Sequence, residues 1–170
     1  MTSQDAIGVG TLLVGAMTLI GGFIIVGLQN QSAKRLTCLQ IFVGVAAQYD
    51  APDMQLCRAS LARCLLADRN ALEINDRLLV FYENIAILNR RHVLDEELLA
   101  NTFAVDVCGY WYALEHYVRH VRDKFKDESL YIEFQRLKDR FERQTGYGFL
   151  RKQTEEETRT FLEMETRRDP

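Results

Sequence analysis

The feature that most constrains this chain is a run of 22 residues without a charge, from Ile7 to Leu28. As an α-helix that rises about 1.5 Å per residue, the run is about 33 Å long, enough to cross a hydrocarbon core of roughly 30 Å. It lacks the basic start and the short apolar core of a cleaved signal peptide. We therefore expect an uncleaved transmembrane anchor over residues 1–33.

The charges that flank the run predict its orientation. Asp5 precedes the run, whereas Lys34 and Arg35 follow it, with Arg58 and Arg63 further along the chain. Basic residues favour the cytoplasmic side of a membrane. We expect a single-pass protein of the inner (cytoplasmic) membrane, with its N-terminus outside and its body in the cytoplasm.

The rest of the chain has the size and the composition of a helical domain. The sequence holds 21 Lys and Arg and 24 Asp and Glu, with both signs mixed, so nucleic-acid binding is not expected. With only 2 Pro and with apolar repeats of helical period, the predicted class is all-α. We expect one N-terminal transmembrane helix, then an antiparallel helical bundle over residues 34–148 and a charged C-terminal arm over residues 149–170.

Within the anchor, small residues recur at spacings that place them on one stripe of the helix. They are Gly8, Thr11, Gly15, Thr18 and Gly22. Small residues allow two membrane helices to pack closely, so this seam predicts docking on a membrane protein complex, and it also permits a homo-oligomer in the lipid bilayer. The alternative is ordinary membrane-helix composition, in which glycine is common.

Apolar residues at helical spacing divide the body into helices. One helix is expected to end near Asp50, which would cap the next helix; another is expected to run from about Asn70 to Arg90. The following helix, capped by Asp95, is expected to run to about Lys126. The stripe of the Asn70 helix is Ile74, Leu78, Phe81, Ile85 and Leu88. The stripe of the Asp95 helix is Phe103, Val107, Tyr110, Leu114, Tyr117 and Val121.

A further helix is expected after residues 127–129, and the charged arm follows it. Thr154 and Glu157 predict a capping box at the start of a last helix. The apolar face of that helix is Phe161, Leu162 and Met164. A helix with so small a face buries little by itself, so the arm is predicted to be either a mobile tail or a partner-binding contact.

Four segments resemble a bacterial domain family of unknown function. They are Phe81–Ala86, Arg90–Arg91, Val93–Leu98 and Tyr110–Trp111. The resemblance extends from about Leu36 to Phe141 and implies an anchor helix followed by a helical body, with no assigned activity. The family often has glycine where His92 stands, so we expect His92 to follow its helix in the left-handed region.

Two histidines are the best candidates for metal ligands. His116 and His120 are spaced i, i+4, which lets two imidazoles share a metal. The segment lacks the glutamate of a zinc-protease motif. A solvated helix face is the favoured interpretation, and a metal site or a pH-sensitive contact are the alternatives.

Two acids, Glu83 and Asp106, lie within apolar stretches and are candidate buried carboxylates. A buried acid is costly unless it is paired, and Arg90, Arg91 or the Trp111 indole are candidate partners. No phosphate-binding loop, nucleophile elbow or dinucleotide fingerprint occurs in the sequence. We expect no enzyme, no catalytic residue, no cofactor and no metal.

Three functions fit these features. The first is a non-catalytic accessory or scaffold subunit of a larger membrane complex, for which a respiratory or photosynthetic complex is one possible host. The second is a membrane-tethered regulator that binds a soluble protein through the C-terminal arm. The third, which the sequence favours least, is a metal-binding enzyme built on His116, His120 and the two acids.

Overall fold

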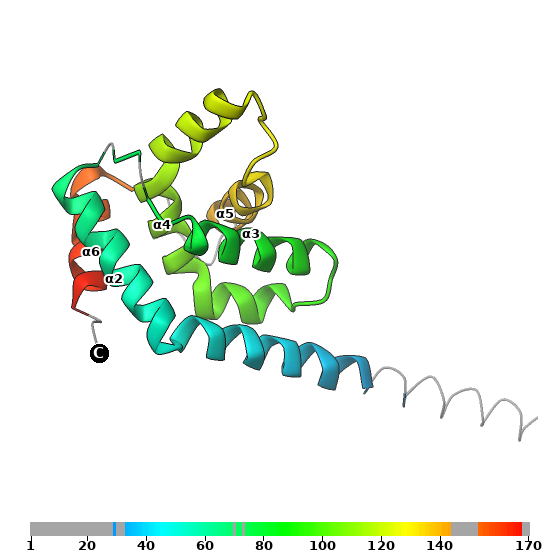
Figure 1. Cartoon of the computed structure of the whole chain (residues 1–170). Coiled ribbons are helices and arrows are strands. Elements are labelled where there is room, and N and C mark those ends of the chain that lie inside the picture. Colours follow the sequence, from blue (N-terminus) through cyan, green and yellow to red (C-terminus); the bar gives the residue numbers. More distant parts are fainter. Residues whose placement is uncertain (1–28, 30–32, 70, 73, 144–152, 168–170) are drawn as a thin grey trace, which may run out of the picture. The chain divides into compact units, whose positions relative to one another are not determined.

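The structure, a computed structural model, describes residues 29, 33–69, 71–72, 74–143 and 153–167 (Figure 1). Every regular element in these ranges is a helix, which confirms the predicted all-α class. The uncharged run and its seam of small residues lie outside the described residues. Among the helices that are described, none combines the length and the hydropathy that a membrane span requires.

The chain divides into two compact units, Met1–Gln40 and Ile41–Pro170. Residues 33–40 of the first unit are helical, and so are residues 41–50 of the second. The described helices that follow are α2 (Pro52–Ala67), α3 (Arg77–Arg90), α4 (Glu96–Phe125), α5 (Ile132–Arg143) and α6 (Glu155–Thr166). The predicted boundary between helical body and C-terminal arm, at residue 148, thus lies within the second unit.

The starts of α2 and α3 differ from the prediction. Asp50 does not cap α2, because Ala51 is the N-cap residue and makes no side-chain cap hydrogen bond. A residue before proline is disfavoured in the helical region, so Ala51 in front of Pro52 takes the extended, non-helical cap conformation. Helix α3 begins at Arg77 rather than near Asn70, since the Asn75 side chain accepts a hydrogen bond from the Arg77 N–H at 2.9 Å and so favours a turn there.

The connection between α3 and α4 confirms the local predictions. Helix α3 ends at Arg90, and the chain then reverses its direction (Figure 1). His92 has a φ of 56°, which is the expected left-handed conformation. The Asp95 carboxylate accepts a hydrogen bond from the Leu98 N–H at 2.9 Å and caps α4 as expected.

Aromatic rings form the centre of the second unit. Tyr82 of α3 stacks on Phe134 of α5, with ring centroids 4.9 Å apart, and Trp111 of α4 meets Phe134 edge-on at 5.3 Å. Such pairs add to the stabilisation that burial of their area provides. The stripe residues that are 4% exposed or less are Leu78, Phe81, Ile85, Phe103, Val107, Tyr110 and Leu114. Periodicity therefore predicts most of the core-facing positions of α3 and α4.

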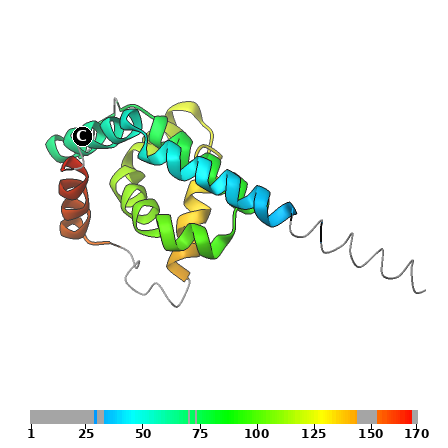
Figure 2. The same cartoon turned by 90° about the horizontal axis from the view of Figure 1, so that it is seen from below.

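Helix α6 packs against α2 and α4, and both views show it beside α2 (Figures 1 and 2). Its predicted capping box is present: Glu157 accepts from the Thr154 N–H at 2.7 Å, and Thr154 accepts from the Glu157 N–H at 3.2 Å. Phe161 and Leu162 are 4% and 1% exposed, whereas Met164 is 50% exposed. The C-terminal arm is thus neither of the predicted alternatives, because two of its three apolar residues belong to the core of its own chain.

Gly109 of α4 provides a test of this packing. A Cβ at Gly109 would lie 2.7 Å from the Phe161 ring, so Gly109→Ala is expected to lower the free energy of unfolding by about 1–3 kcal/mol. A Cβ at Gly44 would have no atom within 4 Å, so Gly44→Ala is expected to raise it by up to about 1 kcal/mol. Denaturant unfolding of the full chain in mild detergent measures both. Equal shifts for the two variants would contradict the seating of Phe161 on α4.

Candidate functional site

A network of buried polar side chains connects α6 to the rest of the second unit. Arg58 of α2 and Glu165 of α6 are 2% and 1% exposed, and the Arg58 Nε lies 3.5 Å from Glu165 Oε2. The Tyr110 hydroxyl of α4 donates a hydrogen bond to the same carboxylate oxygen at 2.5 Å. We call these residues, together with Tyr49 and Tyr82, the buried network.

The two further tyrosines extend the network to α3. The Arg58 guanidinium lies 3.9 Å from the centroid of the Tyr49 ring, which is a cation–π contact. The Tyr82 hydroxyl donates to the Tyr49 hydroxyl at 3.2 Å. Helical residues 41–50, α2, α3, α4 and α6 each contribute one side chain to the network.

Burial controls the protonation of the tyrosines. Burial is the main reason that the pKa values of Tyr49, Tyr82 and Tyr110 are raised well above that of a solvated phenol. The neighbouring Glu165 carboxylate raises the pKa of Tyr110 further. For Arg58, burial lowers the pKa, but Tyr49 and Glu165 offset this, and the net shift is upward. The network thus contains neutral phenols and a charged guanidinium at neutral pH.

This arrangement is suited to holding helices together. Perturbed pKa values mark catalytic sites, but structural ion-pair networks produce them as well. Arg58 and Glu165 are almost completely covered, and neither lines the groove on the neighbouring surface. The contacts that these groups make are with one another, across helices, which indicates a structural role.

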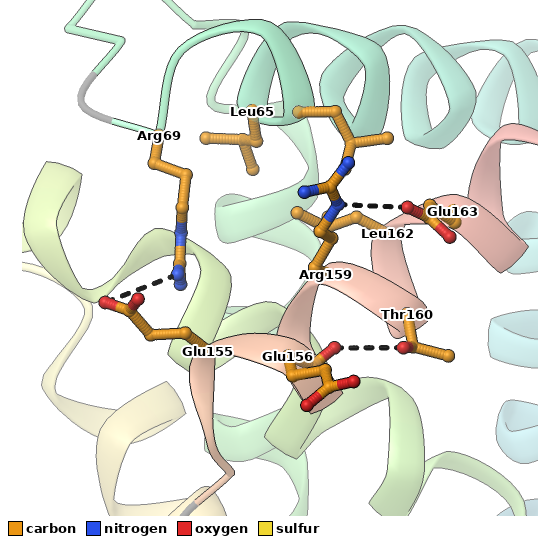
Figure 3. A pocket seen from close by; sticks show the side chains of 9 residues that line it. Leu65, Arg69, Glu155, Glu156, Arg159, Thr160, Leu162 and Glu163 are labelled. Carbon is orange, nitrogen blue, oxygen red and sulfur yellow. Dashed lines mark hydrogen bonds and ion pairs between the residues drawn. The ribbon is translucent and has the colours of Figure 1, made fainter.

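A groove of about 720 Å³ lies between α2 and α6 (Figure 3). Its apolar lining comes from Leu65, Leu66 and Leu162. Two ion pairs stand at its edge: Arg69 with Glu155 at 3.8 Å, and Arg159 with Glu163 at 3.1 Å (Figure 3). The groove therefore combines an apolar lining with charges that already pair with each other.

Glu83 has a role that the sequence analysis missed. Its carboxylate accepts hydrogen bonds from the N–H groups of Glu133 at 3.2 Å and Phe134 at 2.7 Å. These groups belong to the first turn of α5, whose free N–H groups need acceptors. Glu83, which is half-buried on α3, therefore caps the N-terminus of α5.

Two of the predicted partners, Arg90 and Trp111, have other contacts as well. Arg90 pairs with Glu133 at 3.4 Å, and the Trp111 ring packs on Phe134 and lies 5.9 Å from the Lys138 ammonium. Asp106 is buried on α4, with 9% of its surface exposed. For Glu83 the partners were two backbone N–H donors of α5, which side-chain pairing rules could not find.

The two histidines lie on the surface of α4. His116 is exposed, and His120 is half-buried at the edge of a hollow near the end of that helix. Over the described residues, the side chains of His, Cys, Asp and Glu form no group of three that could hold a metal ion. The structure therefore adds no third ligand to the i, i+4 pair.

The predicted partner-binding residues fall into two groups. Gly8, Thr11, Gly15, Thr18 and Gly22 lie outside the described residues. On α6, Phe161 and Leu162 pack inside the chain, and Met164 is left on the surface. A regulator that used the arm as its contact would have to release these core side chains first.

The buried ion pair can be tested by mutation. Glu165→Ala is expected to lower the free energy of unfolding by about 3–5 kcal/mol, because Arg58 would stay buried without its carboxylate. Glu163→Ala, which removes an exposed carboxylate two residues away on the same helix, should cost about 1 kcal/mol or less. Unfolding by denaturant measures both variants.

An apolar replacement of the pair provides the control. The double variant Arg58→Met with Glu165→Leu removes both charges and is expected to recover most of the loss. If Glu165→Ala and Glu163→Ala are equally stable, the pair is not the contact that retains α6.

Comparison with known families finds a match over the main part of the second unit. A family model described as a domain of unknown function (DUF4760) matches residues 42–141. Neither curated proteins nor solved structures provide a match to the chain. The match begins in helical residues 41–50 and ends in α5, and it leaves out α6. Because the match extends over more than half of the sequence, this protein belongs to the DUF4760 family.

Proposed function

We propose that this protein is a non-catalytic accessory subunit that docks on a larger membrane protein complex through an N-terminal transmembrane helix. The observation that carries the proposal is the uncharged run from Ile7 to Leu28, with its small residues on one stripe. Close packing is the main force between helices in lipid, and a continuous small-residue seam favours it. The expected partner is therefore another membrane helix.

The polar side chains of the body support a scaffolding role. Arg58 and Glu165 hold α6 on the second unit, and Glu83 caps α5. Catalysis requires such groups to converge on a position that a substrate can reach. Here these three side chains serve contacts between helices.

The residues that follow the run support its proposed orientation, with the N-terminus outside and the body in the cytoplasm of a bacterial cell. Lys34 and Arg35 are exposed on the helical part of the first unit. Leu36 and Leu39 are also 62% and 51% exposed there. Exposed leucines beside basic residues suit the boundary between lipid and cytoplasm, where apolar side chains enter the acyl region and cations contact headgroups.

Protease accessibility tests this topology. Protease added to intact spheroplasts is expected to leave residues 41–170 uncut, because the membrane separates them from the enzyme. After lysis of the spheroplasts, the same protease should cut exposed sites of the body. Digestion of the body in intact spheroplasts would overturn the proposed orientation.

Substitutions in the seam test the docking. Gly15→Leu and Gly22→Leu should reduce the recovery of co-purifying membrane proteins severalfold, because a leucine separates the two helix backbones. Leu13→Ala changes the opposite surface and is the matched control. Mass spectrometry after mild-detergent purification measures the recovery. Equal recovery with all three variants, or recovery of a soluble partner alone, would contradict the accessory-subunit proposal.

A further inference from the structure

A second hollow, of about 530 Å³, lies at the turn between α4 and α5. Its lining contains three aromatic rings, three aliphatic side chains and four polar side chains. They are Tyr117, Phe125, Tyr131, Leu72, Val121, Leu130, Asp76, His120, Lys124 and Asp127. None of these belongs to the buried network or to the α2–α6 groove. The volume is within the range of small-molecule pockets.

Side-chain hydrogen bonds brace the turn that forms the hollow. Arg122 donates to the Leu130 carbonyl at 2.9 Å and to Gln135 Oε1 at 3.0 Å. The Asp127 carboxylate accepts from the N–H and the hydroxyl of Ser129 at 2.8 and 2.6 Å. These contacts order the turn before any ligand arrives, which reduces the entropic cost of binding.

The backbone of the turn is also constrained. Lys126 and Tyr131 have φ values of 54° and 56°, in the left-handed region that side-chain-bearing residues seldom adopt. Tyr131 directly precedes α5, and its ring lines the hollow. The position of this ring is thus maintained at a conformational cost.

The side chain of Asp76 does not take the usual position of a helix N-cap residue. Asp76 is the N-cap residue of α3, yet its side chain makes no cap hydrogen bond. The carboxylate instead accepts a hydrogen bond from the Tyr131 hydroxyl through Oδ2 at 3.4 Å and lines the hollow. A capping aspartate normally turns toward its own helix, whereas this exposed carboxylate faces the hollow and the Tyr131 ring.

The charge of the lining favours a cation. Among the described lining residues, Asp76 and Asp127 are acidic and Lys124 is basic, and the nearby Arg122 guanidinium is held by the Leu130 carbonyl and Gln135. The Lys124 ammonium lies 5.6 Å from the centroid of the Phe125 ring, so one ring of the hollow already attracts a cation. Phe125 and Leu72 are 64% and 45% exposed and can contact an apolar group.

We propose that this hollow binds a small organic cation. The ammonium group lies between the Asp76 carboxylate and the Tyr117 and Tyr131 rings, and the apolar part of the ligand packs on Leu72 and Phe125. Aromatic faces and a carboxylate together recognise an alkylammonium by cation–π attraction and ion pairing. A free amine and a lysine side chain of a polypeptide share this chemistry.

Calorimetric titration of the full chain in mild detergent tests the proposal, with benzylammonium as the probe and benzyl alcohol as its neutral counterpart. Benzylammonium is expected to bind with a dissociation constant on the order of 1 mM. Benzyl alcohol should bind at least about fivefold more weakly, because it cannot pair with Asp76. No binding of benzylammonium, or equal binding of the two probes, would overturn the proposal.

Charge-neutralising variants locate the site. Asp76→Asn should weaken benzylammonium binding about fivefold and leave folding intact, because the lost carboxylate makes no cap hydrogen bond. Asp123→Asn removes an equal charge from an exposed position of α4 outside the lining and should have no effect. If both variants weaken benzylammonium binding equally, the effect comes from nonspecific electrostatics, and the proposed site is wrong.

A third probe distinguishes the two sources of the cation. N-acetyl-lysine amide mimics a lysine within a polypeptide. If the natural ligand is a protein side chain, this probe is expected to bind at least as well as benzylammonium. A free amine is the ligand if this probe binds more weakly while benzylammonium remains sensitive to Asp76→Asn. Tyr117→Leu should weaken either ammonium and spare benzyl alcohol, because it removes a ring and keeps the apolar volume.

Discussion

The ion pair between Arg58 and Glu165 is the interaction on which the rest of the second unit depends. Taking two charges out of water is costly, and a buried pair persists only with good geometry and further polar contacts. Here Tyr110 donates to the carboxylate, and the Tyr49 ring covers the guanidinium. Since these residues come from different helices, the two charges meet only when α6 packs against α2 and α4. The pair thus contributes specificity in addition to stability, and the Phe161 ring over Gly109 reinforces it.

This dependence changes how the domain is delimited. The family match ends at residue 141, yet α6 supplies Phe161, Leu162 and Glu165 to the interior. A protein truncated at the end of the match would lose the carboxylate that pairs with Arg58 and would uncover the surfaces of α2 and α4 on which α6 packs. The same packing withdraws the apolar face of α6 from partners, so under the proposed function the anchor helix, rather than the C-terminal arm, makes the principal contact. The groove and the hollow remain as surface features that a further ligand can reach.

Local signals in the sequence predicted several details of the fold. Asp95 caps α4, Thr154 and Glu157 form their capping box, and His92 takes the left-handed conformation. The same kind of reasoning misplaced the start of α3, where the Asn75 side chain turns the chain. It also sought the partner of Glu83 among side chains, namely Arg90, Arg91 or the Trp111 indole, although two N–H groups of α5 bond that carboxylate. Periodicity shows that a polar residue lies near the core and does not show which distant backbone group it meets.

The sequence by itself determined the all-α class, the core-facing stripes of α3 and α4 and the N-terminal caps of α4 and α6, because these depend on residues within about one or two helical turns of each other. Only the tertiary structure decided that α6 completes the core and that Glu83 caps α5. It also decided that Asp76 turns toward a hollow of aromatic rings. The contacts concerned join residues 55, 51 and 55 positions apart, from Tyr110 to Glu165, Glu83 to Phe134 and Asp76 to Tyr131. No spacing rule reaches across such separations, because the path of the intervening helices determines which side chains meet.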